Sequence, residues 1–216
     1  MHLGGNPCEL KEIKKLSIKY KFSIIEDASH ALGSKYKEIK IGKAKYSDIS
    51  IFSFHPVKMI TTGEGGALLT ENKILDKKFK ILRSHGIIKN QKELSKKKMP
   101  GWYYENKYLS SNYRLTSIQA ALGISQLSKL NLFLKRRNYL AKVYETELKN
   151  LPLKCQKINP YNFSSRHLFI ILLKKNLRDK LYLFLKNKKI QTNLHYIPIY
   201  KHPFFHKKFK SKNYPV

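Results

Sequence analysis

Apolar runs alternate with lysine-rich amphipathic stretches along this chain. Continuous apolar runs at 22–25, 49–52, 66–70 and 167–174 predict short buried strands. Apolar residues at helical spacing predict helices over 7–20 and 74–84, and the polar stretch 33–46 predicts a loop or short hairpin. Because helices alternate with strands, the pattern favours an α/β fold.

The stretch from residue 86 to residue 111 has no clear periodicity and is broken by Pro100-Gly101. Aromatic residues are concentrated in it: Trp102, Tyr103, Tyr104 and Tyr108. Such rings either pack on the adjacent helix or reach a partner subunit.

A helix signal follows this loop. Thr116 and Gln119 have the spacing of a capping box, which predicts a long helix that runs to about Asn150 and is stopped by Pro152. Beyond it, a strand over 167–174, a helix over 177–187 and a strand over 190–196 predict a small α+β lobe. We therefore expect a large domain over 1–150 and an incomplete small domain over 151–216.

Net charge is the outlying property of the composition. The 216 residues are 42% hydrophobic, as in a globular protein, but carry a formal net charge of +30. A basic nucleic-acid-binding protein is therefore an alternative of another class. The lysines are scattered, no nucleic-acid-binding motif accompanies them, and the runs 96–98 and 207–210 read as solvated loops. We expect no specific nucleic-acid partner.

Cysteine usage and hydropathy indicate a reducing, aqueous compartment. Cys8 and Cys155 form neither a C-x-x-C pair nor a disulfide framework, and we expect no metal site. No apolar run approaches the length of a membrane span, and no secretion signal is evident. The expected location is the cytoplasm, without a membrane partner.

Lys58 stands out from the many other lysines. It lies in a glycine-rich turn just after the strand 49–52, between Val57 and Met59. An apolar setting favours a neutral, nucleophilic amine, whose natural use is a Schiff base. The alternative is an ordinary connecting turn.

Asp27 follows the strand 22–25, and open α/β sheets bind ligands at the carboxyl ends of their strands. A pyridoxal phosphate site needs a lysine to hold the aldehyde and a carboxylate to keep the ring nitrogen protonated. Asp27 and Lys58 supply this pair. The alternative for Asp27 is a helix or turn cap.

Four ordered motifs carry a family resemblance: Asp27-Ala28-Ser29-His30-Ala31, Ser53-Phe54-His55-Pro56-Val57-Lys58, Gly63-Glu64-Gly65-Gly66, and Asn112-Tyr113-Arg114 before Gln119-Ala120-Ala121-Leu122-Gly123. In order and spacing they resemble the DegT/DnrJ/EryC1/StrS family of sugar-nucleotide aminotransferases. The resemblance extends from about His2 to beyond Ile199. It implies fold type I of the pyridoxal-phosphate-dependent transferases, with part of the large mixed-sheet domain and part of the small lobe.

The resemblance also implies roles for individual residues. Lys58 would hold pyridoxal 5'-phosphate and move a proton as general acid and base, and Asp27 would pair with the pyridinium nitrogen. His30 would lie near the cofactor ring, and Ser53 would bind the cofactor phosphate. Asn112 would reach the same phosphate from the neighbouring subunit of a homodimer with shared active sites.

The substrates are expectations of the same kind. The amino donor would be glutamate, and the acceptor a UDP-linked 4-keto-6-deoxy-hexosamine of pseudaminic acid or related surface-glycan biosynthesis. His195 and Tyr196 are candidates for substrate contact. The alternatives are an aminotransferase for another nucleotide-linked keto sugar, or a dehydratase of the family, against which the presence of Lys58 argues.

Two departures from the family pattern stand out. Ser110-Ser111 stands where the family usually has Gly-Tyr, which puts the turn geometry there in question. The family's segment before the aspartate, with its phosphate loop and ring-stacking aromatic residue, has no counterpart here, and neither does the end of the closing lobe. We therefore expect the 216-residue chain alone to be inactive.

Overall fold

A computed structural model describes residues 1–206, and the basic run at 207–210 lies outside the described residues. The chain forms two compact units. The larger contains Met1–Leu151 and Cys155–Ile171, and the smaller contains Pro152–Lys154 and the described residues from Leu172 onward. Among the described residues, no helix combines the length and apolarity that crossing a membrane requires.

The larger unit begins with a 3₁₀ turn and alternates short strands with helices. Its elements are η1 (Leu3–Gly5), α1 (Leu10–Tyr20), β1 (Ile25–Asp27), β2 (Lys35–Tyr36), β3 (Ile39–Lys40), β4 (Ile49–Ser53), β5 (Gly66–Leu69), α2 (Lys73–Leu82), β6 (Ile87–Ile88), β7 (Glu105–Asn106), α3 (Ser117–Ser128), α4 (Leu130–Glu147) and β9 (Asn162–Phe163). β1, β4 and β5 confirm the strands predicted over 22–25, 49–52 and 66–70. α1 and α2 confirm the helices predicted over 7–20 and 74–84. The ends of these elements are shifted by a few residues.

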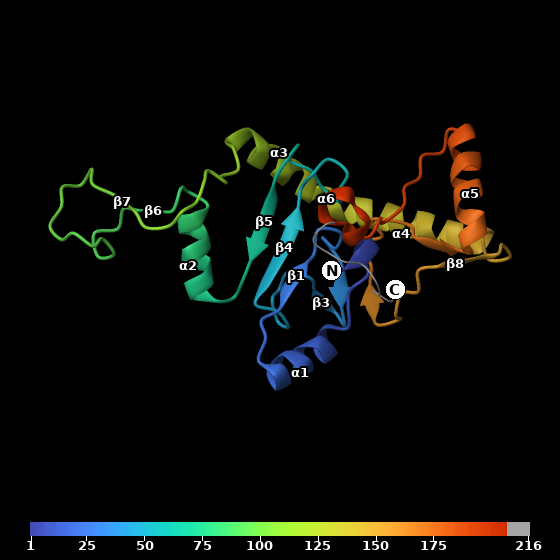
Figure 1. The fold of residues 1–216 in the computed structure, drawn as a ribbon, viewed down its shortest axis with the longest axis horizontal. Coiled ribbons are helices and arrows are strands. Elements are labelled where there is room, and N and C mark those ends of the chain that lie inside the picture. Colours follow the sequence, from blue (N-terminus) through green and yellow to red (C-terminus); the bar gives the residue numbers. More distant parts are fainter. Residues whose placement is uncertain (207–216) are drawn as a thin grey trace. The chain divides into compact units, whose positions relative to one another are not determined.

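A three-stranded mixed sheet in the order β1-β4-β5 organises this unit (Figure 1). β1 runs parallel to β4, with Ile25 opposite Ile49 and Asp27 opposite Ile51. β5 runs antiparallel to β4, with Leu68 opposite Ile51. The parallel pair places the carboxyl ends of β1 and β4 at the same edge.

The two faces of the sheet differ in burial. Glu26, Ser50 and Phe52 lie on one face and are buried. Phe52 joins the core cluster that also contains Leu10, Ala28, Ala31, Tyr36 and Ile41. On the other face, Ile25 is 59% exposed and Leu68 is 51% exposed. A sheet with parallel strands normally has both faces covered. Here the second face is an open apolar surface.

The predicted hairpin over 33–46 is confirmed. β2 and β3 pair antiparallel, with Tyr36 opposite Ile39, and β9 adds to β2 as a third strand. Tyr36 is 1% exposed, and its ring meets those of Tyr46 and Tyr161 edge to face. The hairpin therefore closes one side of the core.

The long helix predicted from Thr116 is confirmed at its start and corrected in its middle. Thr116 and Gln119 form the capping box reciprocally. The helix is interrupted at Lys129, between α3 and α4. There the Lys129 amide bonds to the Gln126 carbonyl, three residues back, and Ser128 Oγ donates to the Ser125 carbonyl. These local bonds tighten the turn and separate the two helices.

The stretch 86–111 is a loop with one short hairpin, β6 with β7. Trp102 is 76% exposed and Tyr104 is 54% exposed, whereas Tyr108 lies with its ring 6.0 Å from the Lys78 amine of α2. The ring of Tyr108 therefore lies close to a side chain of the adjacent helix, and the contact of the other rings with a partner subunit stays a prediction.

The remaining elements are β8 (Leu153–Cys155), β10 (Ile171–Leu173), α5 (Lys175–Asn187), η2 (Ile199–Lys201) and α6 (Pro203–His206). β8 pairs with β10, and α5 confirms the helix predicted over 177–187. The strand predicted over 167–174 is limited to β10. The strand predicted over 190–196 is wrong: no described residue pairs with it, so its apolar residues Ile190 and Leu194 stay exposed.

Candidate active site

Asp27 and Ser53 lie at the same edge and on the same face of the central sheet. Asp27 ends β1 and Ser53 ends β4, and Asp27 is paired in parallel register with Ile51, two residues before Ser53. Because side chains alternate along a strand, Asp27, Ile51 and Ser53 share one face, the open one. The sheet therefore delivers a carboxylate and a hydroxyl to adjacent strand ends.

A loop closed on Phe54 carries Lys58 directly beyond that edge. The Phe54 carbonyl accepts hydrogen bonds from the Thr62 amide and from Thr61 Oγ1, each at 3.0 Å. The Phe54 amide donates to the Gly65 carbonyl at 2.8 Å. Because both ends of the loop are fixed to one residue of the strand end, Lys58 stays close to the ends of β1 and β4.

Lys58 is half-buried, and its amide donates to the His55 carbonyl at 2.9 Å. Its side-chain amine has no hydrogen-bond or ion-pair partner among the described residues. The predicted apolar setting is one-sided, since Met59 is 3% exposed but Val57 is 61% exposed. The reason is that Met59 follows the chain back into the core while Val57 lies on the outer side of the turn.

Asp27 is half-buried and ionised at neutral pH. Burial acts to raise the pKa of its carboxyl, but hydrogen bonds from Ser29 outweigh burial, and the pKa lies below its ordinary value. The Ser29 amide donates to Asp27 Oδ1 at 3.1 Å. Through this hydrogen bond Asp27 caps a local turn, as in the alternative interpretation of this residue. The carboxylate stays charged at the end of β1.

His30 lies three residues beyond Asp27 and is 3% exposed. Its Nδ1 accepts from the Gly4 amide at 3.4 Å, and its ring centroid lies 4.4 Å from that of His167. Ser165 Oγ donates to the His30 carbonyl at 2.7 Å. The sequence contains no local signal for this histidine pair, because its members are far apart in the chain. The role of His30 beside a cofactor stays a prediction.

Asn112 is exposed, and among the described residues its side chain makes no hydrogen bond to the Lys58 loop. Its Oδ1 accepts from the Arg114 amide at 3.1 Å, and it forms a backbone bridge with Ser84. His195 and Tyr196 belong to the smaller unit, where both are exposed and their rings lie 4.4 Å apart. The structure places Asp27 and Ser53 at adjacent strand ends and Lys58 in the loop that follows β4, and the roles of all the candidates stay predictions.

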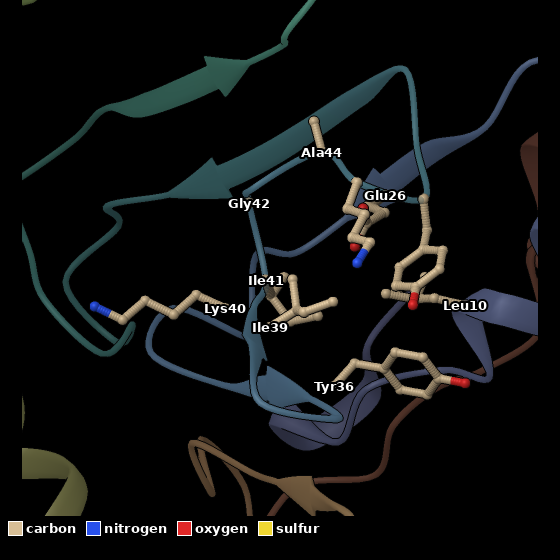
Figure 2. A pocket seen from close by; sticks show the side chains of 10 residues that line it. Leu10, Glu26, Tyr36, Ile39, Lys40, Ile41, Gly42 and Ala44 are labelled. Atoms are coloured by element: carbon tan, nitrogen blue, oxygen red, sulfur yellow. The ribbon is translucent and has the colours of Figure 1, made fainter.

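The pocket in Figure 2 lies on the buried face of the sheet, away from these residues. Glu26, Leu10 and Tyr36 line it, as do residues of the hairpin. The Glu26 carboxylate accepts from Ser47 and Ser50 and contacts His2 Nε2 at 2.7 Å. The Glu26 carboxylate that lines the pocket thus has hydrogen-bond partners. We therefore regard the pocket as part of the scaffold behind the site.

A strand-end aspartate and serine followed by a lysine-bearing loop form the arrangement that the sequence motifs predicted. A family model described as the DegT/DnrJ/EryC1/StrS aminotransferase family matches residues 1–216. The chain belongs to this family. The predicted fold, part of a fold type I transferase, is confirmed by solved structures of its members.

Among curated members of the DegT/DnrJ/EryC1/StrS family, the UDP-4-amino-4,6-dideoxy-N-acetyl-beta-L-altrosamine transaminase of Campylobacter jejuni (strain 81-176) is 44% identical over 208 residues, which are 94% of this chain and 52% of the relative. PseC of Helicobacter pylori, an aminotransferase involved in the biosynthesis of pseudoaminic acid, is 33% identical with a TM-score of 0.84, over 100% of this chain and 56% of that one.

The PLP-form of the sugar aminotransferase Spr1654 from Streptococcus pneumoniae is 25% identical with a TM-score of 0.83, over 96% of this chain and 56% of that one. The chain therefore spans about half the length of the family members it matches.

Proposed function

We propose that this chain is the lysine-bearing part of a pyridoxal-phosphate-dependent sugar-nucleotide aminotransferase. The observation that carries the proposal is the parallel register of β1 and β4, which puts Asp27 and Ser53 at one sheet edge beside the loop of Lys58. Open α/β sheets bind their ligands at such an edge. The family to which the chain belongs is described as an aminotransferase family.

The residues at this edge fit pyridoxal phosphate. The cofactor requires an amine for its aldehyde, and the Lys58 amine has no competing partner among the described side chains. It requires an anionic partner for its ring nitrogen, and the lowered pKa of Asp27 keeps that carboxyl ionised. Ser53 adds a half-buried hydroxyl as a donor to a phosphate oxygen. Spr1654, a relative, is known in a PLP-form.

When bound, the cofactor supplies an electron sink for the carbon that gains or loses the amino group. Asp27 would hold the proton on the ring nitrogen by its negative charge. The Lys58 Nζ would take and return the proton at the reacting carbon. The hydrogen bonds from Thr61 and Thr62 to Phe54 keep this amine at the strand edge.

The substrate proposal follows from the relatives. The Campylobacter relative is named for a UDP-linked 4-amino-4,6-dideoxy sugar, and PseC for pseudoaminic acid biosynthesis. We assign glutamate as amino donor and a UDP-linked 4-keto-6-deoxy-hexosamine as acceptor. GDP-perosamine synthase of Vibrio cholerae, 29% identical, supports the second candidate, an aminotransferase for another nucleotide-linked keto sugar.

A homodimer completes the proposal. Asn112 is exposed and carried by the segment before α3, so it is available to a neighbouring subunit, where it would bind the cofactor phosphate. Trp102 and Tyr104 are exposed in the same way. His195 and Tyr196 would contact the substrate. The cytoplasmic location stays a prediction.

The test is co-expression of this chain with the part of the Campylobacter jejuni transaminase that it does not cover. The purified complex is titrated with pyridoxal phosphate and then assayed with glutamate and a panel of UDP- and GDP-linked keto sugars. A visible absorbance band that borohydride removes, with amino transfer to the UDP sugar, supports the proposal. Transfer only to another sugar selects the second candidate. Salt-sensitive nucleic-acid binding without a band would favour the nucleic-acid-binding alternative.

A further inference from the structure

Helix α3 approaches the Lys58 loop along one face. Gln119 and Gly123 are one turn apart on this helix and therefore lie on the same face. A Cβ atom at Gly123 would lie 2.9 Å from Thr62 Cγ2, so the helix backbone passes close to the loop. A Cβ atom at Gly65 would lie 2.5 Å from Thr62 Oγ1 and 2.9 Å from Leu115 Cδ1.

Gln119 uses both ends of its amide at this junction. Its Oε1 accepts from the Thr116 amide and from Thr116 Oγ1, each at 3.0 Å, which closes the capping box. Its Nε2 donates to the Glu64 carbonyl at 3.0 Å. The same carbonyl accepts from Thr62 Oγ1 at 2.7 Å. The first turn of α3 is therefore bonded to the far end of the loop that carries Lys58.

We infer that Gln119 is a positioning residue for Lys58, an inference that rests on the proposed function. The hydrogen bonds of Phe54 close the base of the loop, and the bond from Gln119 adds a second attachment, from Glu64 to α3. A loop attached to two elements retains less freedom than one closed only at its base, so this bond helps to hold the flexible lysine side chain at the strand edge. Asn112 lies four residues before the same capping box, so Gln119 also joins the Lys58 loop to the segment of this chain that we expect to reach a neighbouring subunit.

Substitution of Gln119 by Glu separates the two bonds. Glutamate at this position retains an oxygen for the capping box, where Glu and Gln serve equally. It loses the N–H donor and places a carboxylate oxygen against the Glu64 carbonyl. The matched control is Gln126→Glu, the same change on the same helix, where the side chain makes no hydrogen bond among the described residues.

Hydrogen exchange measured by mass spectrometry reads the bond directly in the 216-residue chain fused to a soluble carrier. The amides of Lys58 and Thr62 are hydrogen-bonded within the loop. We expect Gln119→Glu to speed exchange in the peptide 56–66 by about five-fold, the effect of one lost neutral hydrogen bond. Exchange in α3 should stay unchanged. Gln126→Glu should change neither.

A second readout is the reactivity of Lys58. Each protein is treated with pyridoxal phosphate and borohydride, and the modified lysines are mapped by mass, with exposed Lys142 of α4 as the reference. We expect the ratio of Lys58 to Lys142 modification to fall in Gln119→Glu only. Unchanged loop exchange, faster exchange in α3 as well, or an unchanged ratio would overturn the positioning role. If the protein without substitutions is modified more at Lys142 than at Lys58, the proposed function is overturned. The exchange result still decides whether Gln119 holds the loop.

Discussion

The buried pair of His2 and Glu26 supports β1 directly behind Asp27, and its removal should be costly. The two side chains are 2% and 4% exposed, and His2 Nε2 lies 2.7 Å from Glu26 Oε2. Substitution of His2 by Ala leaves the carboxylate buried with only the Ser47 and Ser50 hydroxyls as partners. An uncompensated buried charge of this kind costs about 3 kcal/mol of unfolding free energy.

A second substitution, Glu26→Gln, tests whether the two side chains interact. In the unmodified chain, Glu26→Gln weakens a charge-assisted hydrogen bond and should destabilise the larger unit. In the His2→Ala background it replaces an unpaired buried carboxylate with a neutral amide, so it should stabilise. Residues in direct contact show such non-additivity, whereas distant sites do not.

The pH dependence follows from the shifted pKa values. Burial acts to raise the pKa of Glu26, but its hydrogen bonds with His2 and Ser47 lower it below 4.5. Its contribution is therefore present above pH 4.5 and is lost as the pH falls through the folded pKa. Burial acts to lower the pKa of His2, but hydrogen bonds with Cys8 and Glu26 raise it above 6.5. Its contribution is present below pH 6.5 and is lost as the pH rises through the folded pKa.

Pulse proteolysis over a urea series, on the chain fused to a soluble carrier, measures the four free energies at pH 5.5 and 8. We predict that Glu26→Gln changes the free energy of unfolding with opposite signs in the two backgrounds. We also predict that the unmodified chain is more stable than the His2→Ala Glu26→Gln double variant by a larger margin at pH 5.5 than at pH 8. Additive free energies would refute it, because they would mean that the two side chains do not interact.

Two further predictions concern carboxylates of the larger unit. Asp27→Asn in the completed enzyme should retain the cofactor but lose most of its turnover, since a neutral amide does not hold the ring nitrogen protonated; turnover close to that of the parent would leave Asp27 as a turn cap. Glu105 accepts from the amides of Ser95 and Lys96, which lowers its pKa to about 2. The contribution of Glu105 to the order of the loop is thus present above pH 4.5 and is lost only as the pH falls through about 2. Proteolysis of the loop 91–107 should therefore be constant from pH 5 to 8 in the parent. It should be faster at every pH in Glu105→Gln.

The sequence predicted those parts of the site that depend on short segments. Apolar runs that end in Asp27 and Ser53 located both strand ends, and the capping box at Thr116 located the start of α3, because these signals lie within a few residues. The bond from Gln119 to Glu64 joins residues 55 apart in the chain, and no local pattern encodes it.

The wrong predictions have several origins. The apolar residues from Ile190 onward have the composition of a strand, but a strand exists only with a hydrogen-bonded neighbour, which no described residue supplies. The break at Lys129 depends on which carbonyl each amide of the turn selects, and neither glycine nor proline marks it. Helix 7–20 was predicted three residues too long at its start, since Pro7 and Glu9 also fit an N-terminal turn.

The assignment of Lys58 is the central claim, and peptide mapping tests it most directly. The co-expressed complex is treated with pyridoxal phosphate and borohydride, digested, and analysed for the lysine that carries the pyridoxyl group. We predict stoichiometric modification of Lys58 and loss of both the visible band and amino transfer in Lys58→Ala. Modification spread over many lysines, or full turnover in Lys58→Ala, would contradict it.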